Sequence, residues 1–514
     1  MVDSRSRSPE SSRAARLLGH RIRQVLALDP AATALSFDGT DYPWSFYGDA
    51  VRDLESVLEP YPGARRIGIV LRNRPGPLAA IVATLATGRE LVTLSPHLGD
   101  IGLARDITEL TPDVVVAEPE DWRRAAVLDA TRDCRAVAVR TGADRAFARQ
   151  PVDWRAAPRV AAATDVAVLM MTSGTTGRPK RVELSYDRLL AAFRAAGLSV
   201  DESHDPHLRS TTAILWASLA HISGLYFAIA HVLEGRAVAL LERFDVDAWV
   251  ALVKRHQPRF VRLAPTALRM VLQADVPVEI FHGIRAVGSG TAPLPAELAE
   301  EFERRYGVPV LGTYGATEFA GAIAGWTLQD KLAWGASKRG SVGRAHEGIE
   351  LRVVDPDSES ARVLGPGEVG LLEARGRQLP SDAATWMRTT DLAVIDEDGF
   401  LFIRGRADEA INRGGFKIPP SVIEDALRQH PAVDEVSVVG LPDARLGEVP
   451  AVAVTLRADA TESELMQYLA ERLTRYQRPV AVRVVDHLPR TPSLKISRAQ
   501  VRERYFTDPQ PTAS

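Results

Sequence analysis

The sequence predicts an α/β protein, because short apolar runs alternate with segments of helical periodicity. Runs such as 67–71 and 167–171 are typical of buried strands, and 77–87 has apolar residues at helical spacing. A further helix is expected to begin near Ser185. Strand followed by helix recurs at 212–234, 237–256, 260–274 and 285–306. This alternation is typical of helices layered on largely parallel sheets.

The length and texture of the chain predict more than one domain. A chain of 514 residues is too long for a single hydrophobic core. After about Gly340, turns rich in Gly and Asp become denser between strand-like runs such as 349–354, which predicts a small β-rich subdomain. The pattern of the C-terminal tail, after residue 408, predicts the order β-turn-α-β-β-α-β. We therefore expect a disordered N-terminus at 1–16, an N-terminal domain at 17–407 and a C-terminal domain at 408–514.

Composition excludes several classes of protein. The net charge is -3, so no global basic field favours nucleic acid as a partner. The single cysteine, Cys134, excludes a disulfide framework and a multi-thiolate metal site, and it fits a cytoplasmic protein. The Ser- and Arg-rich N-terminus lacks the apolar core of a secretory signal, and no apolar run is long enough to predict a membrane span.

A loop rich in Gly, Ser and Thr follows the strand predicted at 167–171. Its candidate phosphate-binding residues are Thr172, Ser173, Gly174, Thr175, Thr176 and Lys180. Backbone N–H groups of such a loop can cradle phosphate oxygens, and hydroxyls and a lysine add donors and charge. The spacing is not that of a Walker A loop. A flexible surface loop is the alternative, although one this rich in Ser, Thr and Gly directly behind an apolar strand is unusual.

Further motifs follow in order along the chain. They are Gly312-Thr313-Tyr314-Gly315-Ala316-Thr317-Glu318, Trp386-Met387-Arg388-Thr389-Thr390-Asp391, Phe402-Ile403-Arg404-Gly405-Arg406-Ala407-Asp408, Asn412-Arg413-Gly414-Gly415-Phe416-Lys417 and Leu488-Pro489-Arg490-Thr491-Pro492-Ser493-Leu494-Lys495-Ile496. With the loop at 172–180, they resemble the adenylate-forming acyl-CoA synthetases, a family that includes firefly luciferase and nonribosomal-peptide adenylation domains. The resemblance spans roughly residues 30 to 500. It implies a large N-terminal domain of two layered α/β sheets plus a small β-rich subdomain, and a small mobile α+β C-terminal domain.

The resemblance implies that ATP and Mg²⁺ bind around the second motif. Tyr314 would pack along the adenine, Thr317 would contact phosphate, and Glu318 would help hold the metal. A carboxylate on Mg²⁺ beside a triphosphate would organise the charge released with pyrophosphate. The other residues expected at the nucleotide are Ser289, Gly290, Thr291, Ala292, Pro293, Thr313 and Gly315.

The same resemblance assigns roles to the later motifs. Asp391 and Arg406 would contact the ribose, and Asp408 would be the hinge about which the C-terminal domain rotates between half-reactions. Lys495 would bridge the substrate carboxylate and the α-phosphate, where an ammonium stabilises developing charge. The pair Gly414 and Gly415 would line the entry for the pantetheine arm of CoA.

An acyl pocket is expected where His221-Ile222-Ser223-Gly224-Leu225 begins a helix. Its candidate residues are His221, Ser223, Gly224, Gly288 and Gly312. Apolar neighbours such as Leu219 and Leu225 favour an apolar or aromatic acid. No acidic residue stands directly after His221, where a domain that activates amino acids would place one.

These residues predict an enzyme that activates a carboxylic acid as acyl-AMP and transfers it to a thiol, most simply that of CoA. Arg181, Tyr186, Thr390 and Leu494 replace residues usual in the family, namely Gly, His, Gly and Gly. This divergence leaves open an amide ligase, which joins the acyl group to an amine, and a ligase that loads a carrier protein. A nucleotide sensor without catalysis is disfavoured by the intact motifs. A monomer or homodimer is expected.

Overall fold

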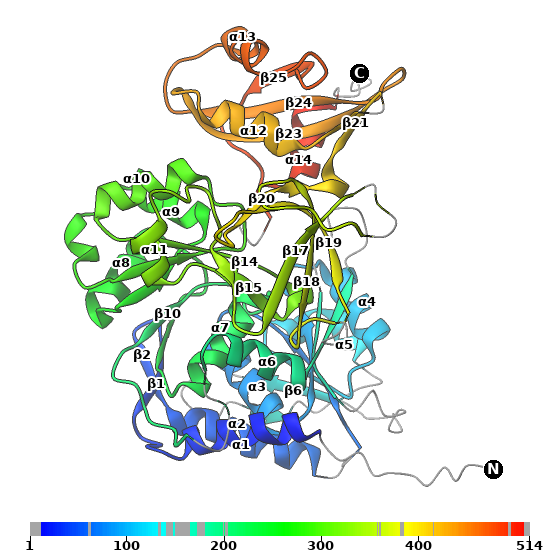
Figure 1. Cartoon of the computed structure of the whole chain (residues 1–514). Helices are drawn as coiled ribbons and strands as arrows, with labels where there is room; N and C mark the ends of the chain where they lie inside the picture. The colour runs from blue at the N-terminus through cyan, green and yellow to red at the C-terminus, as the bar shows by residue number, and fades with distance from the viewer. Residues whose placement is uncertain are drawn as a thin grey trace. The chain divides into compact units, whose positions relative to one another are not determined.

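The computed structural model describes residues 12–59, 63–131, 135–139, 147–149, 165–171, 180–198, 200, 204–356, 358, 361–380, 385–414, 416–491 and 495–507. The chain divides into two compact units (Figure 1). The first comprises Met1–Glu350 and Arg375–Thr385, and the second comprises Leu351–Ala374 and Trp386–Ser514. The boundary expected between residues 407 and 408 falls inside the second unit and remains a prediction.

A seven-stranded sheet, mostly parallel, forms part of the first unit. In spatial order its strands are β7 (Phe147–Arg149), β6 (Arg135–Val139), β5 (Val114–Ala117), β3 (Arg66–Val70), β4 (Glu90–Leu94), β8 (Val166–Met171) and β9 (Arg181–Ser185). Only β7 and β9, at the two edges, run antiparallel to their neighbours. The loop expected to bind phosphate therefore connects two antiparallel neighbours, β8 and β9.

Helix α3 (Pro75–Ala86) is the central element of the main core. Every one of its residues is buried, as expected for a helix that is apolar on all sides. It contacts β3 and β4 on one side and the helices α1 (Arg13–Leu26) and α2 (Trp44–Leu58) on the other. The sheet is thereby held in a packed interior.

Two further sheets complete the first unit. One has the order β10 (Ala213–Leu215), β11 (Val238–Leu240), β1 (Thr33–Phe37) and β2 (Thr40–Pro43). The other has the order β12 (Phe260–Arg262), β13 (Ala286–Ser289), β14 (Val310–Ala316), β15 (Gly321–Gly325) and β16 (Arg344–Ala345). The remaining helices of this unit are α4 (Asp100–Leu110), α5 (Ala125–Ala130), α6 (Tyr186–Ala195), α7 (Ile222–Leu233), α8 (Val246–His256), α9 (Pro265–Gln273), α10 (Ala296–Tyr306) and α11 (Leu328–Trp334).

The second unit contains two sheets. The first, which shares strand ends with the other unit, is β17 (Ile349–Val354), β18 (Gly370–Gly376), β19 (Met387–Ile395) and β20 (Leu401–Arg406). The second has the order β22 (Phe416–Ile418), β21 (Ile411–Arg413), β24 (Gly447–Leu456) and β23 (Val433–Asp443), with β25 (Ala481–Val484) also paired to β24. Its helices are α12 (Pro420–Arg428), α13 (Glu462–Arg472) and α14 (Arg498–Phe506).

The α/β fold class is confirmed, with three differences in detail. The first unit has three sheets rather than two, because the short strands β10 and β11 pair with β1 to form a third. Helix α1 begins at Arg13 behind a Ser12 cap, so residues 13–16 are helical rather than disordered, while residues 1–11 lie outside the described residues. The antiparallel strand β9 was not expected.

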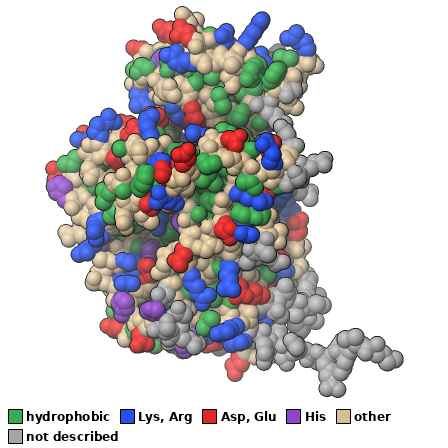
Figure 2. All heavy atoms as spheres, in the orientation of Figure 1, with side chains coloured by type: hydrophobic (Ala, Val, Ile, Leu, Met, Phe, Trp, Pro, Cys, Tyr) green, Lys and Arg blue, Asp and Glu red, His purple; other side chains and the backbone are tan. Residues whose placement is uncertain are grey.

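Charges of both signs are interspersed over the face shown in Figure 2, consistent with the near-neutral net charge. Within the part of the chain that the structure describes, no helix is both long and apolar enough to cross a membrane.

Candidate active site

The carboxyl ends of three neighbouring strands bring the middle motifs together. Parallel pairing places Gly288 of β13 opposite Leu311 of β14, and Ser289 opposite Gly312. Arg262, the last residue of β12, lies opposite Gly288. Ligands of parallel α/β sheets bind outside such strand ends. The predicted nucleotide and acyl residues of these strands therefore share one edge of the sheet.

The turn after β13 depends on the absence of a side chain at Gly290. A Cβ atom there would lie 2.5 Å from Oγ1 of Thr313, whose hydroxyl donates to the carbonyl of Ser289 at 3.3 Å. The next residue, Thr291, has φ of 71°, a left-handed conformation that is costly for a β-branched residue. Such strain clusters at functional sites, and the nucleotide-binding role of this segment remains a prediction. In the residues that follow, Ala292 is partly buried and Pro293 is exposed.

The buried hydroxyl of Ser289 has no hydrogen-bond partner within the described part of the chain. Buried polar atoms are normally paired. A bound ligand would supply the missing partner, which fits the prediction that Ser289 lies at the nucleotide.

Glu318 follows β14 in a single 3-10 turn, Thr317–Phe319. The strand can enter this turn because Gly315 has no side chain: a Cβ atom would lie 2.3 Å from the carbonyl oxygen of Gly321 on β15. Tyr314 is partly buried, with its ring centroid 5.9 Å from that of Phe319. The motif thus places an aromatic ring, a threonine and a carboxylate within five consecutive residues.

Two side chains hold the backbone of this turn. Arg188 of α6 donates to the carbonyl of Glu318, and its other nitrogens donate to the carbonyls of Gln378 at 3.0 Å and Glu183 at 2.6 Å. Gln378 is buried, and its amide donates to the carbonyls of Phe319 at 2.9 Å and Ala322 at 3.0 Å. Burial lowers the pKa of Arg188, and the charge of the Glu318 carboxylate opposes that shift. The carboxylate is therefore carried on a fixed turn.

The residues present fit the binding of Mg²⁺ with nucleotide. Glu318 is partly exposed, so its carboxylate can be reached from solvent. No group of three or more His, Cys, Asp or Glu side chains able to hold a metal occurs among the residues described. Mg²⁺ commonly uses one or two carboxylates together with substrate phosphates and water, so one carboxylate suffices for a metal that arrives with ATP.

The segment before α7 is clamped by one buried side chain. Asn73, in the connection between β3 and α3, donates to the carbonyls of Trp216, Ala217 and Leu241 at 2.9, 3.1 and 3.2 Å. Its carbonyl accepts from the N–H of Leu219 at 2.9 Å. Three carbonyls thus share the two hydrogens of the NH₂ group, and together with the bond to the side-chain oxygen they fix the approach to the predicted acyl pocket.

The helix itself packs closely against that segment. A Cβ atom on Gly224 would lie 2.2 Å from the carbonyl oxygen of Ser218, so only glycine fits there. His221 precedes the first helical residue, and its carbonyl accepts from Leu225 at 3.0 Å. His221 and Ser223 are partly buried, whereas Gly312 is buried with room for a Cβ atom at ordinary contact distance. Close packing therefore requires glycine at 224, and the pocket roles of His221, Ser223, Gly224 and Gly312 remain predictions.

The loop expected to cradle phosphate lies outside the described residues at 172–179, so Thr172, Ser173, Gly174, Thr175 and Thr176 are not described. Lys180, where the description resumes, is exposed. The strand β9 leads from it into α6, which begins next to Ser185 as the sequence predicted and is capped by the Ser185 side chain.

Two residues that depart from the family pattern have structural partners beside this loop. Arg181 donates to the carbonyl of Thr93 at 2.9 Å and forms an ion pair with Asp106. Burial lowers the pKa of Arg181, and the nearby Asp106 carboxylate partly offsets the shift. Tyr186 is buried and donates to the carbonyl of Arg89 at 2.6 Å. Both side chains therefore have polar partners within the first unit.

In the second unit, the predicted ribose contact and the predicted hinge are partners. Asp391 and Arg406 lie opposite each other on β19 and β20. The Arg406 guanidinium binds both carboxylate oxygens of Asp408, at 2.9 and 2.7 Å, and donates to the hydroxyl of Thr390 at 2.8 Å. Thr390, which replaces the usual glycine, thus has a local role.

Lys495 lies on a closed loop of the second unit. The N–H of Thr491 donates to the Lys495 carbonyl at 2.8 Å, and the N–H of Lys495 donates to the Thr491 hydroxyl at 3.2 Å. Lys495 is exposed, while residues 492–494 lie outside the described range. Gly414, with φ of 59°, occupies a left-handed turn, and Gly415 is not described.

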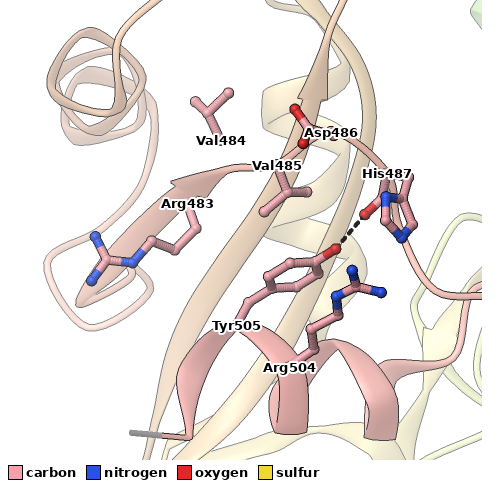
Figure 3. A pocket seen from close by; sticks show the side chains of 7 residues that line it. All are labelled: Arg483, Val484, Val485, Asp486, His487, Arg504 and Tyr505. Carbon is pink, nitrogen blue, oxygen red and sulfur yellow. Dashed lines mark hydrogen bonds between the residues drawn. The ribbon is translucent and has the colours of Figure 1, made fainter. Parts of the chain in front are cut away.

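A separate hollow of about 320 Å³ lies in the second unit (Figure 3). Arg504 and Tyr505 of α14 face the segment that contains Asp486 and His487, and the Tyr505 hydroxyl donates to the His487 carbonyl at 2.6 Å. None of the predicted site residues lines this hollow.

Sequence reasoning missed the residues that position the site. Arg188, Gln378 and Asn73 act on backbone carbonyls far away in sequence, and no local motif marks those contacts. Arg262 could have been noticed, because a cation that ends a short apolar strand is unusual.

Comparisons with known proteins support these assignments at the level of the family. Residues 22–381 match the model described as AMP-binding enzyme, and residues 422–495 match the AMP-binding enzyme C-terminal domain. The indoleacetate–CoA ligase of Aromatoleum aromaticum is 30% identical over 95% of this chain and 98% of its own. The 2-succinylbenzoate–CoA ligase of Bacillus pumilus is 31% identical over 66% of this chain and 70% of its own.

Solved structures agree in fold. ATP-bound MatB from Rhodopseudomonas palustris has a TM-score of 0.79 at 24% identity, with 96% of this chain and 99% of that chain covered. The amide bond synthetase McbA from Marinactinospora thermotolerans has a TM-score of 0.78 at 25% identity, with 95% and 99% covered. The family model spans well over half of the sequence, and the chain therefore belongs to the AMP-binding enzyme family.

Proposed function

We propose that this protein is an AMP-forming ligase that activates an apolar or aromatic carboxylic acid with ATP and Mg²⁺ and transfers the acyl group to CoA. The single observation that carries the proposal is the rigid turn at Glu318, beside strand ends that also bear Ser289 and Gly288. CoA ligases among the relatives, 30 and 31% identical, support the thiol acceptor.

In the first half-reaction, a carboxylate oxygen of the acid attacks the α-phosphorus of ATP, and pyrophosphate leaves. Glu318 would hold Mg²⁺, which supplies neutralisation of phosphate charge when bound. We assign Tyr314 to the adenine, Thr317 to phosphate, and the undescribed loop at 172–179 with Lys180 to the triphosphate. Lys495 would stabilise the charge that develops on the reacting oxygens.

In the second half-reaction, the thiol of CoA attacks the acyl carbon, and AMP leaves with the bonding electrons. We propose that Asp391 and Arg406 hold the ribose, that Asp408 is the hinge, and that Gly414 and Gly415 admit the pantetheine arm. Peptide units around a hinge must absorb large changes in φ and ψ, and Gly405 at φ of 115° already lies in a region that other residues rarely adopt.

An amide ligase is the second candidate. The amide bond synthetase McbA shares the fold with a TM-score of 0.78 and is 25% identical, and an amine could attack the same acyl-adenylate. The cytoplasmic setting and the monomeric or homodimeric state remain predictions.

The deciding experiment has two stages. Pyrophosphate release is first measured across a panel of aryl, aliphatic and dicarboxylic acids with ATP and Mg²⁺. CoA, and then a set of amines, are added to the acids that react, and the products are identified by mass spectrometry. Thioester formation supports the proposal, amide formation without thioester would replace it with the second candidate, and no pyrophosphate with any acid would contradict adenylation.

A further inference from the structure

One cation at the edge of the predicted acyl pocket has no anionic partner. Arg262 is partly buried, and its guanidinium carbon lies 3.5 Å from the ring centroid of Phe227 on α7. Arg262 neither donates a hydrogen bond from its side chain nor has a carboxylate within 4.0 Å among the residues described. Burial lowers its pKa to about 10, so it is still a cation at neutral pH.

The surrounding residues fix the position of this guanidinium. Phe227 lies against its face, an arrangement in which arginine keeps its N–H groups free to point sideways. The indole N–H of Trp216 donates to the Arg262 carbonyl at 2.8 Å and so anchors its backbone. Trp216 belongs to the segment clamped by Asn73. The cation is thus held by the same framework that positions the pocket.

The guanidinium lies directly beside Gly288. A Cβ atom on Gly288 would be 3.0 Å from Nη1 of Arg262 and 2.8 Å from Cζ of Phe260. Gly288 is a predicted pocket residue, and its missing side chain leaves the space that the Arg262 nitrogen borders. A ligand in the pocket could therefore reach this nitrogen.

Glu234, whose charge acts on Arg262, does not pair with it. Glu234, at the end of α7, accepts from Nε of Arg236 at 2.9 Å, and its carboxylate also lies 3.6 Å from Nδ1 of His231. Burial opposes ionisation of Glu234, but the neighbouring His231 and Arg236 lower its pKa to about 2. Glu234 therefore already interacts with two basic side chains, His231 and Arg236. A buried cation without a paired anion is costly, which favours a bound group that supplies the charge.

Resting on the proposed function, we propose that Arg262 recognises a second carboxylate on the acid, at the end of the acyl chain remote from the reacting carboxylate. Arginine binds carboxylates through two parallel hydrogen bonds, which gives geometric selectivity as well as affinity. The substrate would therefore be an apolar or aromatic body with a carboxylate at each end. Phe227 would contact the body and Arg262 its distal end.

Matched pairs of acids test this assignment. The probes are 3-phenylpropanoate against 3-(4-carboxyphenyl)propanoate, and hexanoate and octanoate against the diacids of equal chain length. Pyrophosphate release gives kcat/KM for each acid with wild type, Arg262→Met and Arg262→Lys. The matched control is Arg305→Met, because Arg305 also lies over an aromatic ring, that of Tyr306, but is exposed on α10.

We expect wild type to prefer the diacid in at least one pair. Arg262→Met should lose about 10- to 100-fold in kcat/KM for that diacid, the range for a lost hydrogen bond to a charged group. For the monoacid, kcat/KM of Arg262→Met should differ from wild type by less than about threefold. For the diacid, kcat/KM of Arg262→Lys should lie between those of wild type and Arg262→Met, because lysine keeps the positive charge but cannot form two parallel hydrogen bonds. The Arg305→Met control should match wild type for every acid.

A thermal shift with the same acids and ATP provides a readout that does not require turnover. Stabilisation of wild type, but not of Arg262→Met, by the diacid supports the proposal even if turnover is slow. Equal losses for both members of each pair, or a preference for the monoacid in all pairs, overturn it and leave Arg262 as a packing residue. Absence of pyrophosphate with every acid contradicts the proposed function instead, since diacid binding is still scored by the thermal shift.

Discussion

The turn at Glu318 and the residues of the second unit are positioned in opposite ways. The backbone around Glu318 is held by Arg188 and the buried Gln378, and its strand tolerates no side chain at Gly315. Arg406, Asp408 and Lys495 are partly or fully exposed, and Arg406 and Asp408 are bonded mainly to each other. The difference teaches that the first set is built to stay fixed, whereas the second can change partners at low cost.

The proposed reaction explains why the Glu318 turn is fixed and why Lys495 is exposed. An adenine contact serves both half-reactions, and a metal ligand must be in place before ATP reacts, so both benefit from pre-organisation. A lysine that serves one half-reaction must be able to leave, and the exposed position of Lys495 permits this. Substitutions behind Glu318 should therefore affect stability and rate together, and substitutions in the second unit should affect one step alone.

The largest effect is expected for Lys495→Ala. Loss of one group that stabilises transition-state charge typically lowers the rate by about 10²–10³-fold. Pyrophosphate formation should fall by that amount, while a supplied acyl-adenylate should still be converted to the CoA thioester at near the normal rate. Rapid-mixing assays of the two half-reactions check this. The matched control is Arg502→Ala, another exposed cation of the second unit. Equal losses in both steps would show that Lys495 does not have the assigned role.

Asn73→Ala should give the largest loss of stability. The substitution leaves three partly buried carbonyls and one buried N–H without the Asn73 side chain, and we expect a loss of about 2–4 kcal/mol in the free energy of unfolding. Urea denaturation followed by fluorescence measures it. Asn412→Ala, at an exposed position, is the matched stability control and should change the value by less than about 0.5 kcal/mol. If Asn73→Ala changed the free energy of unfolding by as little, the hydrogen bonds of Asn73 would not be needed for folding.

Some elements of the fold could be predicted from the sequence and others could not. The elements of the sheet were predictable because strands such as β3 and β8 are continuous apolar runs, and α6 begins at a capping serine. Strand β9 was missed because it is a short segment between the loop that ends at Lys180 and the helix that begins after Ser185. Its alternation of side chains is visible only once β8 is its neighbour.

The site was predictable only where its residues form a motif. Glu318 and Lys495 belong to runs with recognisable neighbours. Gln378 contacts carbonyls 56 and 59 residues away, and Asn73 contacts carbonyls 143 to 168 residues away. Such contacts depend on how the chain folds back on itself, so a single sequence carries no local sign of them.

Gln378→Leu should have a moderate effect on rate. Leucine removes both hydrogen bonds to the Glu318 turn, but it also removes a buried amide oxygen that has no partner among the described residues. Stability should therefore fall by only about 1 kcal/mol, while pyrophosphate formation should fall about tenfold because the carboxylate is displaced. Gln329→Leu, exposed on α11, is the matched control. An unchanged rate would show that the turn holds its shape without Gln378.

The smallest effect on stability is expected for Asp408→Asn, and it tests whether the exposed residues can indeed exchange partners. The Arg406–Asp408 pair is 39% and 34% exposed, and such pairs contribute about 0–1 kcal/mol. Unfolding at low and high salt should therefore differ little from wild type. Because the substitution frees the Arg406 guanidinium for the ribose, we expect KM for ATP to fall a few-fold, while Arg406→Gln raises it. A stability loss above about 2 kcal/mol would place this pair with the fixed contacts of the first unit and remove the difference between the two regions.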